Sequence, residues 1–428
     1  MVADQPTEFR VTMENTAQVS RDTRIIGVHP ATTLIHPAQS WGSKRFGRNP
    51  LDNLCSGAWR FAVSEGFRVK FSKTLVVIVV IAAVAVAGIF TYSMLSVPQP
   101  TCTSIWKCAA PYPVHGGGAV GVAGQSCGAN SVNIYCIGGV DAGGGPRNDV
   151  YTATISASGN ITEWNRSFST YPQNVTGQAC AVTSGYIYCV GGIHDISEDD
   201  LSASYYAKLL ANGSLGVWEP TTPYPIPIDS ESCVGWSLYI YCIGGNNETG
   251  GTQSNVAPSS AVWFAPVSSS GIGEWARTTS YPSGIYFPSC YVTDGFVYCL
   301  NGSDSNGDPL GSTYFAPVTP DGVGRWALTT AYPVASVGPS CVIASGYIYC
   351  IGGETAGGQS PTFTNFVYFA QISTSGIGLW TQGTSYPRNV GTSCVTLQEN
   401  IYCVGGFDES TPGLESTVNY ATLSSISG

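Results

Sequence analysis

The stretch "SCYVTDGFVYCLNG", Ser289–Gly302, places two cysteines nine residues apart around an Asp-Gly pair. Asp-Gly between alternating apolar runs predicts a two-residue type I′ hairpin turn, because that turn needs a positive φ at both central positions. With Asp294 and Gly295 as the turn, the fourth pair outward is Cys290 and Cys299. Such a pair is not hydrogen-bonded, and its Cα atoms lie ~4.5 Å apart. A disulfide spans that distance, so we expect one that staples the hairpin.

Five further cysteine pairs have the same spacing: Cys127 with Cys136, Cys180 with Cys189, Cys233 with Cys242, Cys341 with Cys350, and Cys394 with Cys403. Successive pairs begin 51 to 57 residues apart, which indicates a repeat of propeller-blade length. Three turn centres depart from the Asp-Gly type, and there we expect longer, distorted loops: Ser131-Val132, Ser237-Leu238 and Gln398-Glu399. Zinc binding by the cysteines is disfavoured, because His115 and His194 are the only histidines after residue 95.

Each repeat continues with a Gly-Gly doublet, an aromatic strand and a tryptophan. The residues are Gly138-Gly139, Tyr151 and Trp164; Gly191-Gly192, Tyr206 and Trp218; Gly244-Gly245, Phe264 and Trp275; Gly302, Phe315 and Trp326; Gly352-Gly353, Phe369 and Trp380; Gly405-Gly406 and Tyr420. Over residues 102–428 this pattern resembles the kelch repeat family, which implies a β-propeller of four-stranded blades. The spacing from aromatic residue to tryptophan is longer than in that family, so we expect an extended turn between the third and fourth strands. Asn301 replaces one doublet glycine, and Asn tolerates the left-handed conformation.

The repeat count leaves one strand at each end of the domain. The last unit stops at Gly428 without a tryptophan strand, and "CTSIWKCAAPYP", Cys102–Pro113, is a fourth strand with no third strand before it. Joining the two pieces gives an all-β, six-bladed propeller closed by its N-terminal strand, which hides the exposed edges. We expect Cys102 and Cys108 to pair with each other.

A 22-residue segment without charge, Thr74–Leu95, is long enough to cross the ~30 Å hydrocarbon core as a helix. Arg68, Lys70 and Lys73 precede it, so the positive-inside rule places the N-terminus in the cytoplasm. We therefore expect a mostly disordered cytoplasmic segment 1–73, a transmembrane signal-anchor helix 74–95, a linker 96–101 and an extracellular propeller 102–428. A cleaved secretory signal is the alternative, but a 73-residue leader is long for one.

Cysteines and glycosylation motifs agree with that topology. Fourteen of the fifteen cysteines follow residue 95 and only Cys55 precedes it, as an oxidising outer compartment permits. All the Asn-x-Ser/Thr motifs also lie on the outer side and make it a candidate glycoprotein: Asn160, Asn165, Asn174, Asn212, Asn247 and Asn301. We expect localisation in the cell membrane with the propeller outside.

Charge and residue types limit the chemistry of the outer part. Residues 96–428 hold seven Lys/Arg and 21 Asp/Glu, a balance of −14, which argues against a nucleic-acid partner. The five arginines are scattered over different repeat positions, which disfavours sialidase-type recognition of a carboxylate. The cysteines already have partners, which disfavours galactose-oxidase-type copper chemistry. An enzyme is thus the less favoured interpretation, and a sugar-acid mutarotase or glycosidase remains the alternative.

The loops after the Gly-Gly doublets carry most of the acidic residues and share one face of a propeller. The candidate residues of a ligand- or cation-binding face are Asp141, His194, Asn247, Asp304, Thr355, Asp408 and Arg388, and the alternative is that these loops are only a solvated surface. The segment "DSNGD" has the alternation of a calcium loop, with Asp304, Asn306 and Asp308 as ligands, although Pro309 stands where an EF-hand has its glycine. No other cofactor is expected. We predict a surface protein for recognition or adhesion, with a protein or glycan partner, or for cell-envelope structure.

Overall fold

The computed structural model describes residues 102–113, 121–141, 145–194, 200–247, 257–355, 362–408 and 413–428. The predicted cytoplasmic segment, transmembrane helix and linker lie outside the described residues. In the part that is described, no helix has the length and apolar character needed to cross a membrane.

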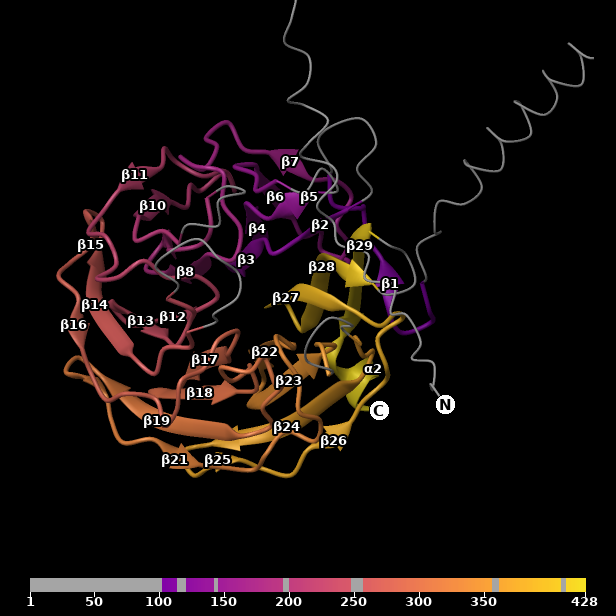
Figure 1. The fold of residues 1–428 in the computed structure, drawn as a ribbon. Helices are drawn as coiled ribbons and strands as arrows, with labels where there is room; N and C mark the ends of the chain where they lie inside the picture. The colour runs from indigo at the N-terminus through magenta and orange to yellow at the C-terminus, as the bar shows by residue number, and fades with distance from the viewer. Residues whose placement is uncertain are drawn as a thin grey trace, which may run out of the picture. The chain divides into compact units, whose positions relative to one another are not determined.

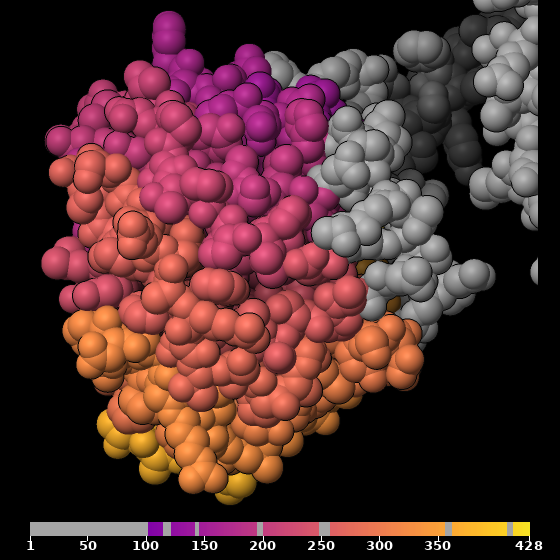
Figure 2. All heavy atoms as spheres, turned by 60° about the vertical axis from the view of Figure 1, so that its left-hand side comes forward, coloured from indigo at the N-terminus to yellow at the C-terminus, as the bar shows by residue number. Residues whose placement is uncertain are grey.

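Six four-stranded antiparallel sheets are arranged around a central axis, as the sequence predicts, and the first strand of each blade lies nearest that axis (Figure 1). On the outer wall the blades follow one another in chain order (Figure 2). Blade one is β3 (Ser126–Ala129), β4 (Asn133–Ile137), β6 (Val150–Thr154) and β7 (Asn165–Arg166). Blade two is β8 (Ala179–Thr183), β9 (Tyr186–Val190), β10 (Ser204–Lys208) and β11 (Glu219–Pro220). Blade three is β12 (Ser232–Trp236), β13 (Tyr239–Ile243), β14 (Val262–Ser268) and β16 (Ala276–Arg277). Blade four is β17 (Ser289–Thr293), β18 (Phe296–Leu300), β19 (Thr313–Thr319) and β21 (Ala327–Leu328). Blade five is β22 (Ser340–Ala344), β23 (Tyr347–Ile351), β24 (Val367–Ser373) and β26 (Thr381–Gln382). Blade six is β27 (Gly391–Leu397), β28 (Asn400–Asp408), β29 (Gly413–Thr422) and β1 (Lys107–Cys108).

The stapled hairpins have the predicted register. In blade four Cys290 faces Cys299, and Thr293 faces Phe296 next to the turn. All six spaced pairs form disulfides with Cα–Cα distances of 4.0 to 4.1 Å. The five other bonds join Cys127 to Cys136, Cys180 to Cys189, Cys233 to Cys242, Cys341 to Cys350, and Cys394 to Cys403. Cys102 pairs with Cys108, so all seven predicted disulfides are confirmed.

The second cysteine of each spaced pair is a structural residue and not part of a functional site. These cysteines have no exposed surface, and none of them lines a described cavity. They are Cys136, Cys189, Cys242, Cys299, Cys350 and Cys403. Each lies on the second strand of its blade, between the first and third strands, so its sulfur is enclosed by the sheet and the neighbouring blade. Only the disulfide role predicted for them is therefore available.

The expectation of longer, distorted loops is wrong at Ser237-Leu238 and at Gln398-Glu399, where the turns have two residues. Leu397 pairs with Asn400, so Gln398 and Glu399 alone form the turn, with φ of 49° and 63°. Trp236 likewise pairs with Tyr239 across two residues. In blade one the last paired residues are Ala129 and Ile134, so the turn around Ser131-Val132 is longer, as expected. The side-chain oxygen of Asn130 accepts the N–H groups of Val132 and Asn133 and so stabilises this turn. In blades three and six the disulfide and the strand pairing hold the turn at two residues without Asp-Gly.

Blade six closes the ring as predicted. Lys107 pairs with Tyr420 and Cys108 with Asn419, so β1 is the outer strand beside β29 (Figure 1). Trp106 is fully buried, and its ring meets Tyr386 edge to face at 4.9 Å. The chain ends with a short helix, α2 (Leu423–Ser427).

The extended turn between the third and fourth strands is an additional hairpin in blades three to five. Its return strands are β15 (Gly271–Ile272), β20 (Gly322–Val323) and β25 (Gly376–Ile377). They pair with the ends of β14, β19 and β24, and the chain then returns to form the outer strand. A further short pair, β2 (Val122–Ala123) with β5 (Val140–Asp141), lies beside blade one.

Neighbouring blades are joined by one repeated aromatic contact. The tyrosine of each Tyr-Pro segment meets the tryptophan of the next blade edge to face at 4.9 to 5.0 Å. The pairs are Tyr112 with Trp164, Tyr171 with Trp218, Tyr224 with Trp275, Tyr281 with Trp326, Tyr332 with Trp380, and Tyr386 with Trp106. Such pairs contribute roughly 0.5–1.5 kcal/mol each beyond burial, so the contact makes every blade depend on its neighbours.

Candidate functional site

The channel contains two adjoining cavities of about 410 and 300 Å³ that share part of their lining. Both are formed largely by the four residues that end at the first cysteine of each pair. In blade order these residues are Gly124–Cys127, Gly177–Cys180, Ser230–Cys233, Phe287–Cys290, Gly338–Cys341 and Gly391–Cys394. Gly406 and Phe407 line the larger cavity, so it lies at the end of the channel that carries the Gly-Gly doublets.

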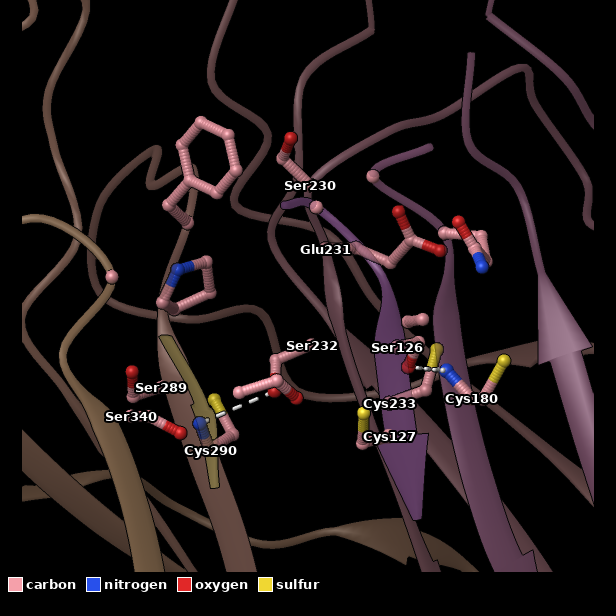
Figure 3. Close-up of a pocket in the computed structure, with 18 of the residues that line it drawn as sticks. Ser126, Cys127, Cys180, Ser230, Glu231, Ser232, Cys233, Ser289, Cys290 and Ser340 are labelled. Atoms are coloured by element: carbon pink, nitrogen blue, oxygen red, sulfur yellow. Dashed lines mark hydrogen bonds between the residues drawn. The ribbon is translucent and has the colours of Figure 1, made fainter. Parts of the chain in front are cut away.

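The serine before the cysteine joins neighbouring blades along the channel wall. The Oγ of Ser126 accepts the N–H of Cys180 at 3.1 Å, and that of Ser232 accepts the N–H of Cys290 at 3.2 Å (Figure 3). Ser340 repeats the contact with the N–H of Cys394. These N–H groups lie at the inner edges of the blades, where an unpaired donor would be costly. The serines therefore have a structural role.

The residues that lie three positions before the first cysteine of each blade are joined by backbone hydrogen bonds, which form a belt around part of the channel. Gly177 donates to Gly124 at 3.2 Å, Ser230 to Gly177 at 2.9 Å, and Phe287 to Ser230 at 3.0 Å. Within the described chain, no such bond continues from Phe287 to Gly338. The belt thus spans blades one to four and is open beyond them.

The residues that lie two positions before the first cysteine of each blade also differ between blades one to three and blades four to six. Blades one to three carry Gln125, Gln178 and Glu231 there, whereas blades four to six carry Pro288, Pro339 and Thr392. The residues of blades four to six all line the larger cavity. The larger cavity therefore lies where the belt is open, and the sixfold repeat is broken in sequence as well as in hydrogen bonding.

Phe287 is the most unusual residue on this rim. Its φ is 51°, a left-handed conformation that is an outlier for a bulky side chain and costs about 1–2 kcal/mol. Four other repeats have glycine at this position. The side chain is nonetheless 41% exposed and lines both cavities. Strain at an exposed aromatic residue beside a cavity is a reason to look for function there.

The lining of the larger cavity also includes two further aromatic rings and one carboxyl group. Phe363 and Phe407 stack with their centroids 6.3 Å apart, and Glu354 lies on the same lining. Desolvation by burial raises the pKa of Glu354. No Lys, Arg or His is found among the described residues that line either cavity. The site therefore combines apolar rings, serine hydroxyl groups and an acid, and its described lining carries no cationic side chain.

Glu231 lies on the wall of the smaller cavity and takes a place that glutamine has in two other blades (Figure 3). The Nε2 of Gln125 donates to the carbonyl of Val404, and the Nε2 of Gln178 to that of Ile137, both at 2.8 Å. By the repeat, the corresponding carbonyl beside Glu231 belongs to Val190. Oε1 of Glu231 therefore takes the place of the amide nitrogen of a glutamine. A Cβ atom added to Gly191 would lie 2.9 Å from this oxygen, and a Cβ atom added to the equivalent Gly138 would lie 2.8 Å from Nε2 of Gln178.

Both carboxyl oxygens of Glu231 are buried without a hydrogen-bond partner of good geometry among the described residues. Desolvation by burial raises its pKa well above the usual range, and Asp229 and Asp200 raise it further. The N–H groups of Glu231 itself and of Ala179 lower it only in part. The neutral acid is favoured, because only its O–H can donate to a carbonyl as the glutamines do.

The binding residues predicted from the sequence do not form this site: none of the seven lines either cavity. Asp141 is buried and lies 3.3 Å from Arg147. Arg388 is also nearly buried, with its Nη1 3.2 Å from Asp408 and 2.7 Å from Glu415. These predicted binding residues are engaged in ion pairs within the protein.

The other predicted residues also have local contacts. His194 is exposed with Nδ1 3.2 Å from the carbonyl of Asn174, and Thr355 bonds to Thr362. The N–H of Asn247 donates to Ala257. The six loop positions are equivalent in sequence, but the loops differ in length, so they do not present one uniform ring.

The calcium hypothesis for Asp304, Asn306 and Asp308 stays a prediction. The Oδ1 of Asp304 accepts the N–H groups of Asn306 and Asp308, at 2.8 and 3.1 Å, so the carboxylate stabilises its own turn. The described residues contain no group of three or more His, Cys, Asp or Glu that could hold a metal ion.

One glycosylation motif is inaccessible. Asn301 has no exposed surface, and its Nδ2 donates to Ser336 at 2.7 Å, so the folded protein offers no site for a glycan there. Its φ of 57° confirms the left-handed conformation inferred for this position. Asn165, Asn174 and Asn212 are exposed, whereas Asn160 and Asn247 are half-buried.

The cavity residues were missed because the sequence interpretation rested on the acidic loops. The available signal was a departure from consensus: Phe287 where glycine recurs, and Glu231 where glutamine recurs. Phe363 lies in the loop after Gly352-Gly353 and Phe407 lies near the end of β28, and sequence alone does not bring them together at the channel.

Comparison with known proteins supports the fold. No protein-family model matches the chain, and no curated protein is similar to it in sequence. Among solved structures, one titled "Structure of YjhT" is 12% identical, with a TM-score of 0.58, and the match covers 73% of this chain and 96% of that chain. At this identity the likeness shows the fold alone.

Proposed function

We propose that this chain is a single-pass cell-surface protein that displays a kelch-like propeller on the outer side of the membrane. The uncharged segment 74–95 with its basic flank supports this topology. The seven disulfides and the exposed glycosylation motifs suit an oxidising compartment. Protease added to intact cells is expected to remove the propeller, and a protected propeller would contradict the topology.

The propeller functions in recognition, and the mouth of its channel binds the partner, a protein or a glycan. Phe287 is the observation that carries this proposal. The chain keeps a strained, partly exposed phenylalanine at a position where glycine would relieve the strain. The ring contacts that of Tyr286, with centroids 4.7 Å apart, but remains partly open to the cavity. Strained residues of this kind cluster at binding sites.

The enzyme alternative receives less support. A sugar acid needs a cationic group for its carboxylate, and the described lining has none. A glycosidase needs two carboxyl groups that reach the substrate, but both oxygens of Glu231 are buried. Recognition requires no such groups.

The test is Phe287→Gly, which restores the residue of four other repeats. We expect the ectodomain to unfold at the same temperature as wild type or higher, because the left-handed strain is removed and offsets the entropic cost of glycine. Binding to intact cells and to a glycan array is expected to fall at least tenfold. Phe168→Ser, which removes a fully exposed phenylalanine outside the cavities, is the matched control and should leave binding unchanged. Unchanged binding by Phe287→Gly would refute the proposal.

A further inference from the structure

The larger cavity has charge of one sign. Glu354 is the charged residue on its described lining, and Arg388, which follows the Tyr-Pro segment of blade five, is bonded to Asp408 and Glu415. The whole outer segment carries an excess of acid, seven Lys/Arg against 21 Asp/Glu in residues 96–428. A negative field of this kind attracts cations and repels anions.

The apolar part of the lining is suited to the same ligand. Phe363 and Phe407 form a stacked pair, and Phe287 is held on the rim. The face of an aromatic ring attracts a cation, most strongly where water is partly excluded. An alkylammonium group satisfies both features, because its methyl or methylene groups contact rings while its charge faces a carboxylate.

Glu354 is partly buried without a cationic partner among the described residues, and such a ligand supplies one. Its carboxyl group makes no hydrogen bond or ion pair with any described side chain, and its backbone is fixed by pairing with Val337 and Phe363. Desolvation raises its pKa, and a cation placed beside it reverses that effect. A neutral ligand would not.

We propose that the cavity at the open side of the channel, between blades four and six, binds an alkylammonium group. This inference rests on the proposed recognition function and names the chemistry that the mouth accepts. The group can come from a lysine side chain of a partner protein or from a small methylated amine. The volume of about 410 Å³ is within the range of pockets that hold small molecules.

Saturation-transfer NMR titrations of the whole ectodomain test the charge requirement. The probes are choline, its uncharged isostere 3,3-dimethyl-1-butanol, and Nα-acetyl-lysine methylamide as a lysine side chain. Choline or the lysine probe is expected to bind at least about fivefold more tightly than the isostere, and which of the two binds more tightly identifies the source. Affinity should fall at high salt and as the pH falls through the pKa of Glu354, because the protonated acid has no charge.

Variants separate the two parts of the site. Glu354→Gln should bring choline affinity down to that of the isostere, and Phe407→Ala should weaken both. Glu399→Gln removes an acid in the β27–β28 turn, outside the cavity, and serves as the control with unchanged affinity. Equal binding of choline and the isostere would overturn the inference, as would absence of binding or binding of uncharged methyl glucoside alone. If any of these three outcomes occurs while Phe287→Gly still abolishes partner binding, the inference of an alkylammonium ligand is wrong and the recognition function stands.

Discussion

Glu231 shows how one atom changes the pH response of a repeat. Gln125 and Gln178 each donate from Nε2 to a carbonyl of the preceding blade, and Glu231 presents an oxygen at the equivalent place. Two acceptors would face each other if the carboxyl were ionised. Burial instead favours a protonated Glu231, so folding at neutral pH takes up a proton.

The sign of the pH effect follows from the raised pKa. In the unfolded chain Glu231 ionises near its ordinary pKa of about 4.3, whereas in the folded protein it stays neutral to higher pH. Stability is therefore complete at pH below that value and is lost as the pH rises toward the folded-state pKa. We expect Glu231→Gln to raise the free energy of unfolding by about 1–3 kcal/mol at pH 8, with little change at pH 4.5.

Denaturant titrations at both pH values measure this effect, and Gln178→Glu is the matched control. That variant places an acid in the equivalent site of blade two and should lose stability as the pH rises. An equal effect of Glu231→Gln at both pH values would show that the carboxyl group is not protonated in the fold.

At the scale of elements, the stapled hairpin was predictable because independent constraints coincide. The cysteine spacing, the alternation of apolar residues and Asp294-Gly295 all require the same register. The channel was not predictable, because its lining comes from six segments that only the closed ring brings together. The Gly-Gly loops were placed on the correct face, but ion pairs such as Arg388 with Asp408 depend on side-chain packing that the repeat does not encode.

The turn at Gln398 and Glu399 offers a test of this element. Both residues have left-handed φ, 49° and 63°, where Asn-Gly is the favoured pair. We expect Gln398→Asn with Glu399→Gly to raise the free energy of unfolding by about 1–2 kcal/mol. Gly295→Ala makes the opposite change, from glycine to a residue with a Cβ atom at a left-handed position. Open space surrounds that Cβ position, so any loss in the free energy of unfolding is due to backbone strain. A thermal melt in which the double variant unfolds earlier would contradict the interpretation.

At the scale of the molecule, stability depends on the joint between the two ends of the propeller. The β1 strand is short, but Trp106 is fully buried between blades five and six. Its Nε1 donates to the carbonyl of Thr384 at 3.3 Å, as Trp326 donates to Thr279 between blades three and four. The joint thus uses the same contacts as the other blade interfaces.

Deleting residues 102–113 is expected to destabilise all six blades together. The deletion exposes the edge of β29 and the pocket of Trp106. Because the Tyr–Trp contacts join each blade to the next, the loss of stability in blade six also destabilises the other blades. Trp106→Ala alone should cost about 3–5 kcal/mol. Tryptophan fluorescence and far-ultraviolet circular dichroism should report one coincident transition at a lower temperature. An unchanged transition after the deletion, or loss of blade six alone while the others unfold as in wild type, would show that the ring does not depend on this closure.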